Sequence, residues 1–159
     1  MAPLRFNSND TGLRFWLKDP TPENIQKSAS VLKEMAQVTE IFSLDRSGPY
    51  PVYKSIYQNF KSQPEKFKKW AREHDAELAN TCINKTSPDI IAALQDDAGF
   101  GRLGDHGGFQ EKVQRIPMII VGPGIKKEVS VKKMRLVDLA PLISEKFQLS
   151  AAPKNVKPN

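Results

Sequence analysis

The pattern that most constrains the fold lies in residues 13–44, where two strand-like runs flank one helical run. Residues 13–18 alternate apolar and polar side chains, which predicts a β-strand with one buried face. Thr21 and Pro22 then predict a helix start, because threonine is a favoured N-cap and proline fits the first helical position. After a run with apolar residues at helical spacing, residues 38–44 predict a second strand. The region therefore has the size of a βαβ unit or a split unit, with a ferredoxin-like arrangement as a further alternative.

Four further segments carry a structural signal. Residues 63–80 predict a second, charged helix, whereas residues 89–95 are short and apolar and fit either a strand or a buried helical turn. Residues 116–121 are the clearest predicted strand, because their nearly continuous apolar character is typical of a sheet covered on both faces. Residues 135–147 predict a C-terminal helix. Together with residues 13–44, these segments indicate a mixed α/β protein.

The charge pattern bears on possible partners. Of the 159 residues, 26% are charged and 39% are hydrophobic, and the formal net charge is +6, so one globular domain with its own core is expected. A basic balance is compatible with nucleic-acid binding, but here the basic residues are mixed with acidic ones or flank short segments. One such stretch combines Lys66, Lys68, Lys69 and Arg72 with Glu65, Glu73, Asp75 and Glu77. We interpret these stretches as solvated faces and not as a nucleic-acid site, because no aromatic residues are spaced among them as a stacking platform requires.

Cysteine and histidine are scarce, which limits the possible metal chemistry. Cys82 is the only cysteine, which excludes a disulfide framework and a cysteine-based zinc site and predicts a small buried side chain. No apolar run approaches the roughly 18 residues of a membrane-spanning helix. Of the two histidines, His74 lies in the charged helix and is expected at the surface. His106 is therefore the imidazole to consider as a metal ligand.

His106 lies in the sequence Gly104-Asp105-His106-Gly107-Gly108, shortly before the apolar run. Glycines on both sides remove side-chain bulk and permit backbone angles that other residues avoid. Such a loop allows an imidazole to stand at the rim of a pocket, with a metal ion or a substrate close to the backbone. The residues by themselves leave two interpretations open, a metal ligand and a structural loop residue.

Three motifs in a fixed order sharpen the functional interpretation. They are Gly-Asp-His-Gly-Gly at 104–108, Ile-Pro-Met-Ile-Ile-Val-Gly-Pro-Gly at 116–124 and Leu-Val-Asp-Leu-Ala-Pro at 136–141. Their order and spacing resemble the C-terminal part of the alkaline phosphatase superfamily over about residues 88–148. More narrowly, the string is similar to type I phosphodiesterase/nucleotide pyrophosphatase proteins and their sulfatase-like relatives. Leu142 departs from the threonine that is usual after the last motif.

The resemblance implies a fold and a division of the chain. The family has a central, mostly parallel sheet with helices on both faces. The chain is thus expected to be part of an alkaline-phosphatase-like three-layer α/β/α fold with a small inserted strand-helix-strand subdomain. The expected division is an N-terminal extension at 1–12, the inserted α+β subdomain at 13–87, the C-terminal part of the hydrolase core at 88–149 and a flexible tail at 150–159.

The resemblance also implies a metal site. The family binds two divalent cations, commonly zinc, through three Asp and three His, and a Thr or Ser attacks a phosphoryl or sulfuryl ester. On this basis His106 is assigned as the last metal ligand, with Asp105 as its neighbour. In a second assignment both residues bind metal, and in a third Asp105 is a plain loop residue. Gln110 and Glu111 follow the loop, and they would orient His106, lie on the substrate side, or simply pack.

Most of the family's site has no counterpart in this sequence. We find no acidic strand end followed by a Thr or Ser nucleophile and no Asp-xxx-His ligand pair, so no catalytic residue is assigned in this chain. One or two ligands cannot hold a two-metal cluster. We therefore expect the C-terminal segment of a metal-dependent phosphodiesterase-type hydrolase. It would be inactive alone, because cleavage of a phosphate ester needs the remainder of the parent catalytic domain.

Two alternatives stay open. A truncated or degenerate copy would be catalytically inactive and would act as a binding or scaffold domain, in which His106 is dispensable. A sulfatase or a phosphoglycerate-mutase-like relative would share the motifs and differ in its substrate. A segment of a larger sheet would also expose a strand edge and apolar faces, from which low solubility or self-association is expected.

Overall fold

The computed structural model describes residues 5–9, 12–99, 108–125 and 135–148 of the chain. The chain divides into two compact units, Met1–Pro117 and Met118–Asn159, and each is described here by itself. This division follows the packing within the chain. It does not test the domain limits expected from the resemblance, which refer to a larger enzyme and stay a prediction.

The first unit is built on a five-stranded sheet with the order β1-β2-β5-β3-β4, in which every neighbouring pair is antiparallel. The strands are β1 (Arg5–Asn9), β2 (Gly12–Trp16), β3 (Val38–Asp45), β4 (Val52–Gln58) and β5 (Ile90–Leu94). Helix α1 (Pro22–Lys33) joins β2 to β3, and helix α2 (Glu65–Asn80) joins β4 to β5. In both cases one other strand lies between the joined strands. Of the alternatives for residues 13–44, a split unit is the one that forms, and a second split unit follows it.

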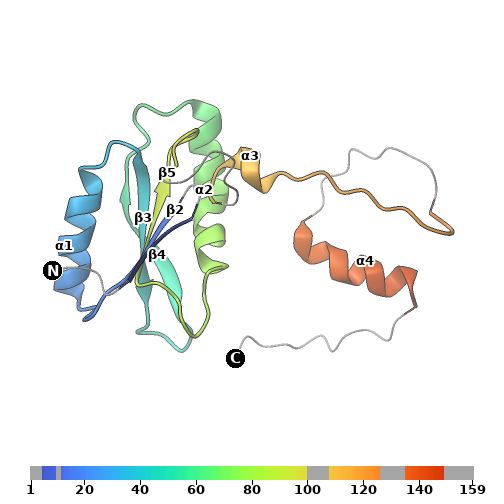
Figure 1. Cartoon of the computed structure of the whole chain (residues 1–159), viewed down its shortest axis with the longest axis horizontal. Helices are drawn as coiled ribbons and strands as arrows, with labels where there is room; N and C mark the ends of the chain where they lie inside the picture. The colour runs from blue at the N-terminus through green and yellow to red at the C-terminus, as the bar shows by residue number, and fades with distance from the viewer. Residues whose placement is uncertain (1–4, 10–11, 100–107, 126–134, 149–159) are drawn as a thin grey trace. The chain divides into compact units, whose positions relative to one another are not determined.

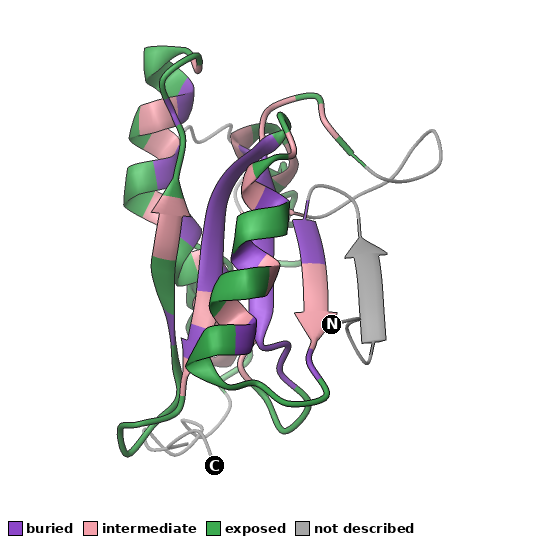
Figure 2. Ribbon diagram, turned by 90° about the vertical axis from the view of Figure 1, so that its left-hand side faces the viewer, coloured by how far each residue is buried: buried purple, intermediate pink, exposed green. Residues whose placement is uncertain are grey.

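The two helices cover opposite faces of this sheet (Figure 1). Strand β5 shows the reason, because its side chains alternate between two separate cores. Ile90, Ala92 and Leu94 pack in the core that contains α1, whereas Ile91 and Ala93 pack in the core that contains α2. All five residues are buried, and the central strands are buried along most of their length while both helices expose their outer sides (Figure 2). The apolar run that fitted either a strand or a helical turn is thus a central strand.

The chain is therefore a mixed α/β protein, as the sequence indicated. Its sheet is antiparallel at every described pairing, where the resemblance implies a mostly parallel sheet in the complete enzyme. Among the residues that the structure describes, every helix falls short of the length and hydropathy that a bilayer-spanning helix needs.

Helix α1 begins where the sequence predicts it. Thr21 is the N-cap, and its Oγ1 accepts a hydrogen bond from the backbone N of Asn24 at 3.3 Å. Pro22 occupies the first helical position, where its missing N–H costs no intrahelical bond. The helix buries Ala29 and Leu32 against the sheet, so its apolar stripe is the face that packs.

Two edge strands of the sheet were not predicted. Strand β1 pairs with β2, and β4 pairs with β3 with a register shift between Ile41 and Phe42. Most residues of β4 are exposed or half-buried, with only Tyr53 buried. Edge strands need one partner and little burial, and their sequences therefore carry a weak hydrophobic pattern.

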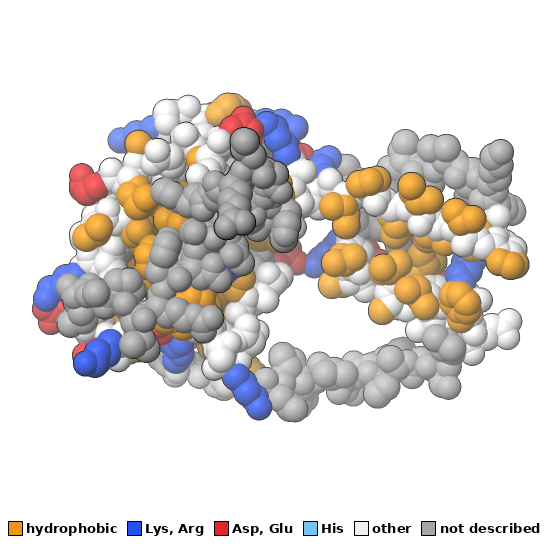
Figure 3. Space-filling view, in the orientation of Figure 1, with side chains coloured by type: hydrophobic (Ala, Val, Ile, Leu, Met, Phe, Trp, Pro, Cys, Tyr) orange, Lys and Arg blue, Asp and Glu red, His pale blue; other side chains and the backbone are white. Residues whose placement is uncertain are grey.

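The strand predicted at residues 116–121 is wrong: this segment has no strand partner among the described residues. Ile119 is 85% exposed and Val121 is 89% exposed. A β-branched apolar run favours an extended backbone, but a strand also needs a neighbour for its N–H and C=O groups. The predicted C-terminal helix forms as a 3-10 turn (Leu136–Asp138) followed by α4 (Leu139–Lys146). Hydrophobic side chains gather on the surface of this second unit (Figure 3).

Candidate functional site

His106 and Asp105 lie in 100–107, outside the described residues. The site is therefore built from the chain on either side of this segment. We call residues 95–99 and 108–112 the loop base. The first part follows directly on β5, and the second leads into the short helix α3 (Glu111–Gln114).

Gln110 closes the loop base. Its side chain is buried, and its Nε2 donates to the carbonyl oxygens of Gln95, at 2.5 Å, and Ala98, at 3.3 Å. These two bonds hold the chain before the loop against the chain after it. Removing the amide would leave the Ala98 carbonyl without its described donor and the Gln95 carbonyl with the backbone N of Ala98 alone, at a cost of about 1–3 kcal/mol. The described contacts of Gln110 are these two bonds at the loop ends, and its expected roles toward His106 and a substrate stay predictions.

Phe109 anchors the second part of the loop base in the core. Its ring is buried and stacks on Phe42 of β3, with ring centroids 6.0 Å apart. Trp70 of α2 donates from its Nε1 to the carbonyl oxygen of Phe109 at 2.8 Å. Gly108 has a φ of 90°, which a side chain would strain. The second glycine of the Gly-Gly pair is thus required by the backbone that leads Phe109 into the core.

Glu111 links the loop base to α2. Its carboxylate lies 3.1 Å from the Nζ of Lys66 on α2 and also pairs with Arg115. The Glu111 side chain is 14% exposed, so these cations offset a charge that is mostly removed from water. Asp97, on the other side of the loop base, pairs with Lys112 at 3.1 Å. Glu111 is therefore engaged by cations and is not presented as a free metal ligand.

A small cavity of ≈ 190 Å³ lies beside the loop base. Its lining includes Phe67 and Trp70 of α2, together with Glu111 and Lys112. His74, the second imidazole, stacks on Trp70 with ring centroids 4.0 Å apart and keeps 38% of its side chain exposed. The expectation that His74 lies at the surface is met in part, since one side of its ring is packed.

The solvated face predicted for α2 is wrong at one position, Asp75. This residue is 2% exposed and belongs to the buried stripe of the helix with Phe67, Ala71 and Ala79. Burial, together with a smaller contribution from the nearby Glu40 carboxyl, raises the pKa of Asp75 to about 8. A signal was present in the sequence: three apolar residues at intervals of four, with an aspartate at the remaining position.

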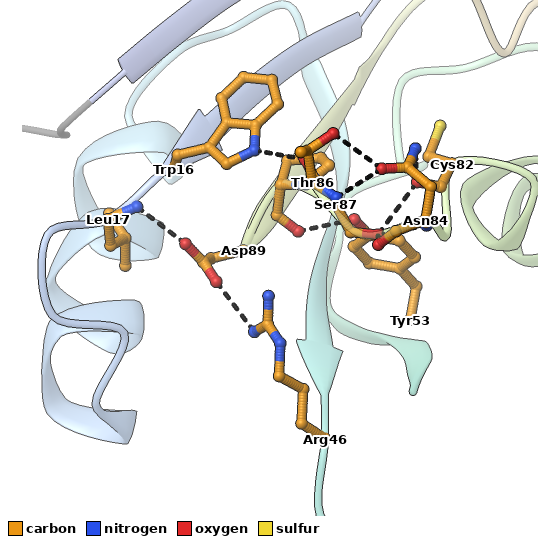
Figure 4. A network of polar contacts seen from close by, with 10 residues as sticks. Trp16, Leu17, Arg46, Tyr53, Cys82, Asn84, Thr86, Ser87 and Asp89 are labelled. Atoms are coloured by element: carbon orange, nitrogen blue, oxygen red, sulfur yellow. Dashed lines mark hydrogen bonds and ion pairs between the residues drawn. The ribbon is translucent and has the colours of Figure 1, made fainter. Parts of the chain in front are cut away.

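A second polar cluster lies at the start of β5 (Figure 4). Asp89 accepts from the backbone N of Leu17 through Oδ2 at 2.8 Å and from Arg46 through Oδ1 at 2.9 Å. The hydroxyl of Tyr53 donates to the carbonyl of Pro88 at 2.6 Å, and burial raises the pKa of that hydroxyl. These groups join the start of β5 to the ends of β2 and β3 and to β4, so we assign the cluster to holding β5 in place.

The zinc site that the resemblance implies needs several nitrogen, sulfur or carboxylate donors close together. Among the described residues, no group of three or more His, Cys, Asp or Glu side chains could hold a metal ion. His106 and Asp105 together supply one nitrogen and one carboxylate, while a catalytic zinc takes three protein ligands and keeps one position open. These two donors fit part of a metal coordination sphere, and the site needs further protein ligands.

Comparisons with protein-family models, with curated proteins and with solved structures give no significant match for this chain.

Proposed function

We propose that this chain is the C-terminal segment of a metal-dependent phosphodiesterase/nucleotide pyrophosphatase-type hydrolase with an alkaline-phosphatase-like fold. In the complete enzyme it contributes His106 as a ligand to one of two divalent cations, most simply zinc. The observation that carries the proposal is the motif string together with the closed loop base. The ends of the segment that contains His106 are held by Gln110 and by the buried Phe109. Precise placement of its ends is what a ligand-bearing loop needs.

The division of chemical tasks follows from the ligand count. When bound, the cations lower the pKa of the Thr or Ser nucleophile and neutralise charge on the phosphoryl group and the leaving oxygen. The nucleophile and the other ligands belong to the remainder of the parent domain. His106 binds the metal through an imidazole nitrogen, and Asp105 lies beside it in sequence. Gln110 and Trp70 act on the loop through backbone carbonyls and hold its base.

The exposure of residues 116–121 supports the proposal that the remainder of the parent domain is needed. They are apolar and β-branched, yet Ile119 and Val121 are almost fully exposed. An extended apolar run of this kind is stable when a neighbouring strand satisfies its backbone and a second layer covers its side chains. We propose that the rest of the parent domain supplies this cover.

The test uses hydrolysis of bis(p-nitrophenyl) phosphate with added zinc or manganese. The chain alone should show no turnover. The upstream coding sequence should contain an acidic strand end followed by Thr or Ser and an Asp-xxx-His pair, and the joined polypeptide should be active. In that polypeptide His106→Ala should lower kcat/KM by more than about 100-fold, because loss of a ligand exceeds the effect of losing a group that merely supports one. His74→Ala, the matched imidazole control, should leave activity unchanged.

Two results would overturn the proposal. Turnover by the chain alone that disappears in His106→Ala would mean that the chain assembles a complete site. An upstream region without a nucleophile, or a joined enzyme indifferent to His106→Ala, would remove the metal-ligand role. Preferential cleavage of p-nitrophenyl sulfate by the joined enzyme would move the assignment to the sulfatase-like relatives.

An inactive binding or scaffold module is the second candidate. The observation that favours it is the first unit, which has buried cores on both sheet faces and a closed loop base without any added chain. Such a module would keep its partner after His106→Ala and would show no zinc-dependent change in stability. The chain's basic balance would direct it to an anionic ligand or partner.

A further inference from the structure

Two carboxylates are buried between α2 and the sheet. Asp75 on α2 is 2% exposed and Glu40 on β3 is 3% exposed. Glu40 accepts a hydrogen bond from Nε2 of Gln58 through Oε1 at 2.7 Å. Oδ1 of Asp75 is buried and has no hydrogen-bond partner among the described residues. A buried carboxylate oxygen in this state is costly when the group is charged.

No cation offsets this pair within the described part of the chain. Glu40 faces Asp75 from β3, and β4 contributes the neutral amide of Gln58. The charge of Glu111 at the loop base is paired with Lys66 and Arg115. Burial raises the pKa of Glu40, while hydrogen bonds to it act in the opposite direction. The Glu40 carboxyl therefore adds to the cost of ionising Asp75 across the interface between α2 and the sheet.

Helix α2 also holds the loop base. Trp70, one and a half turns before Asp75, donates to the carbonyl of Phe109, and Lys66 pairs with Glu111. A change in the packing of α2 on the sheet must therefore alter both contacts. In this way the acid pair and the loop base are connected through one helix.

We propose that Glu40 and Asp75 form a pH-sensitive switch, in which loss of the Asp75 proton loosens α2 from the sheet and releases the loop base. The switch acts through the fold of the first unit. It does not depend on metal binding by His106, so it can hold or fail independently of the proposed function.

The direction of the pH effect follows from linkage. Asp75 has a pKa of about 8 in the folded protein, whereas the ordinary value for an aspartate is 3.8, so the closed state binds the proton more tightly than the open state. The closed state therefore loses stability as the pH rises from about 4 to about 8, and the loss is complete above that range. Within it, one proton is released on opening, and the opening equilibrium rises by up to about tenfold per pH unit.

Hydrogen exchange of the full chain tests the switch. The probes are the Trp70 indole N–H, the amides of α2 and the amide of Phe109, with rates divided by the intrinsic rate at each pH. We expect the corrected exchange of these groups to rise steeply between about pH 5 and pH 8, and that of β5 to rise less. Asp75→Asn should flatten this dependence. Glu73→Gln, which removes an exposed carboxylate from the same helix, should leave it as in the wild type.

The same pH dependence in Asp75→Asn as in the wild type would overturn the proposal. So would a steep rise confined to residues other than α2 and the loop base. Infrared spectroscopy of the wild type provides a measurement that needs no folded variant. A protonated-carboxyl band that is present at about pH 7 and lost by about pH 9.5 supports the switch, and the absence of this band at about pH 7 contradicts it.

Discussion

The two units of this chain use the same kinds of apolar residue with opposite results. In the first unit Ile90, Ile91 and Phe42 are fully buried in cores on the two sides of a sheet. In the second unit Val121 is 89% exposed and Leu136 is 75% exposed. The difference does not lie in hydrophobicity, since both units contain β-branched and aromatic side chains. It lies in whether the chain itself supplies a second layer, which the first unit does with α1 and α2.

The helices of the two units differ in burial in the same way. Helix α1 has a side-chain N-cap and buries Asn24, Ala29 and Leu32, whereas α4 buries none of its residues. The backbone N of Arg135 donates to a carboxylate oxygen of Asp138 at the start of the C-terminal helical segment. Local signals are thus sufficient to set a helix in place, but most of a helix's stability comes from packing of its apolar face.

The largest effect is expected from emptying the core of the first unit. Phe42→Ala removes a ring that is fully buried and stacked on Phe109, and it should lower the free energy of unfolding by about 3–5 kcal/mol. Ile119→Ala, in an exposed apolar position, should change it by less than about 0.5 kcal/mol. Urea unfolding followed by tryptophan fluorescence measures both. Equal losses in the two variants would break the distinction between the units.

A smaller effect is expected at the loop base. Gln110→Ala removes the only described donor to the Ala98 carbonyl and one of two donors to the Gln95 carbonyl, so the free energy of unfolding should fall by about 1–3 kcal/mol. Gln114→Ala is the matched control, because its side chain bonds to a carbonyl at an exposed position and water can replace it. If both variants unfold at the wild-type urea concentration, Gln110 does not close the loop base.

Removal of a helix cap should affect the free energy of unfolding in the first unit but not in the second. Thr21→Ala removes the side-chain acceptor at the start of α1 and should lower the free energy of unfolding by about 1 kcal/mol. Asp138→Ala should leave the main unfolding transition in place and reduce only the helical circular dichroism signal, because α4 buries nothing. A loss of the main transition in Asp138→Ala would show that the second unit contributes to the stability of the first.

The smallest change in unfolding is expected from deleting the second unit. A chain of residues 1–117 should unfold at the urea midpoint of the full chain, because the two cores of the first unit are formed by its own residues. Binding of a hydrophobic dye should fall in the same comparison, because exposed apolar side chains are removed. A lower midpoint would instead indicate that the second unit stabilises the first.

The candidate site was predictable only in part. The sequence singled out the segment with His106 and the residues Gln110 and Glu111 that follow it. It did not reveal that Gln110 bonds back to the end of β5, nor that Lys66 and Trp70 of α2 reach the loop base. These contacts join residues far apart in the chain, and their geometry depends on how α2 lies on the sheet.

Local chemistry by itself determined the helix start at Thr21-Pro22 and the strands on either side of α1, because capping and alternation act over a few residues. Tertiary structure decided the place of β5 between β2 and β3, since strand order depends on crossovers. It also decided that Asp75 is buried and that residues 116–121 remain without a strand partner in the described chain. The physical reason is the same in each case. Burial and strand pairing each require contact between two parts of the chain, and a local sequence specifies only one of the two contacting surfaces.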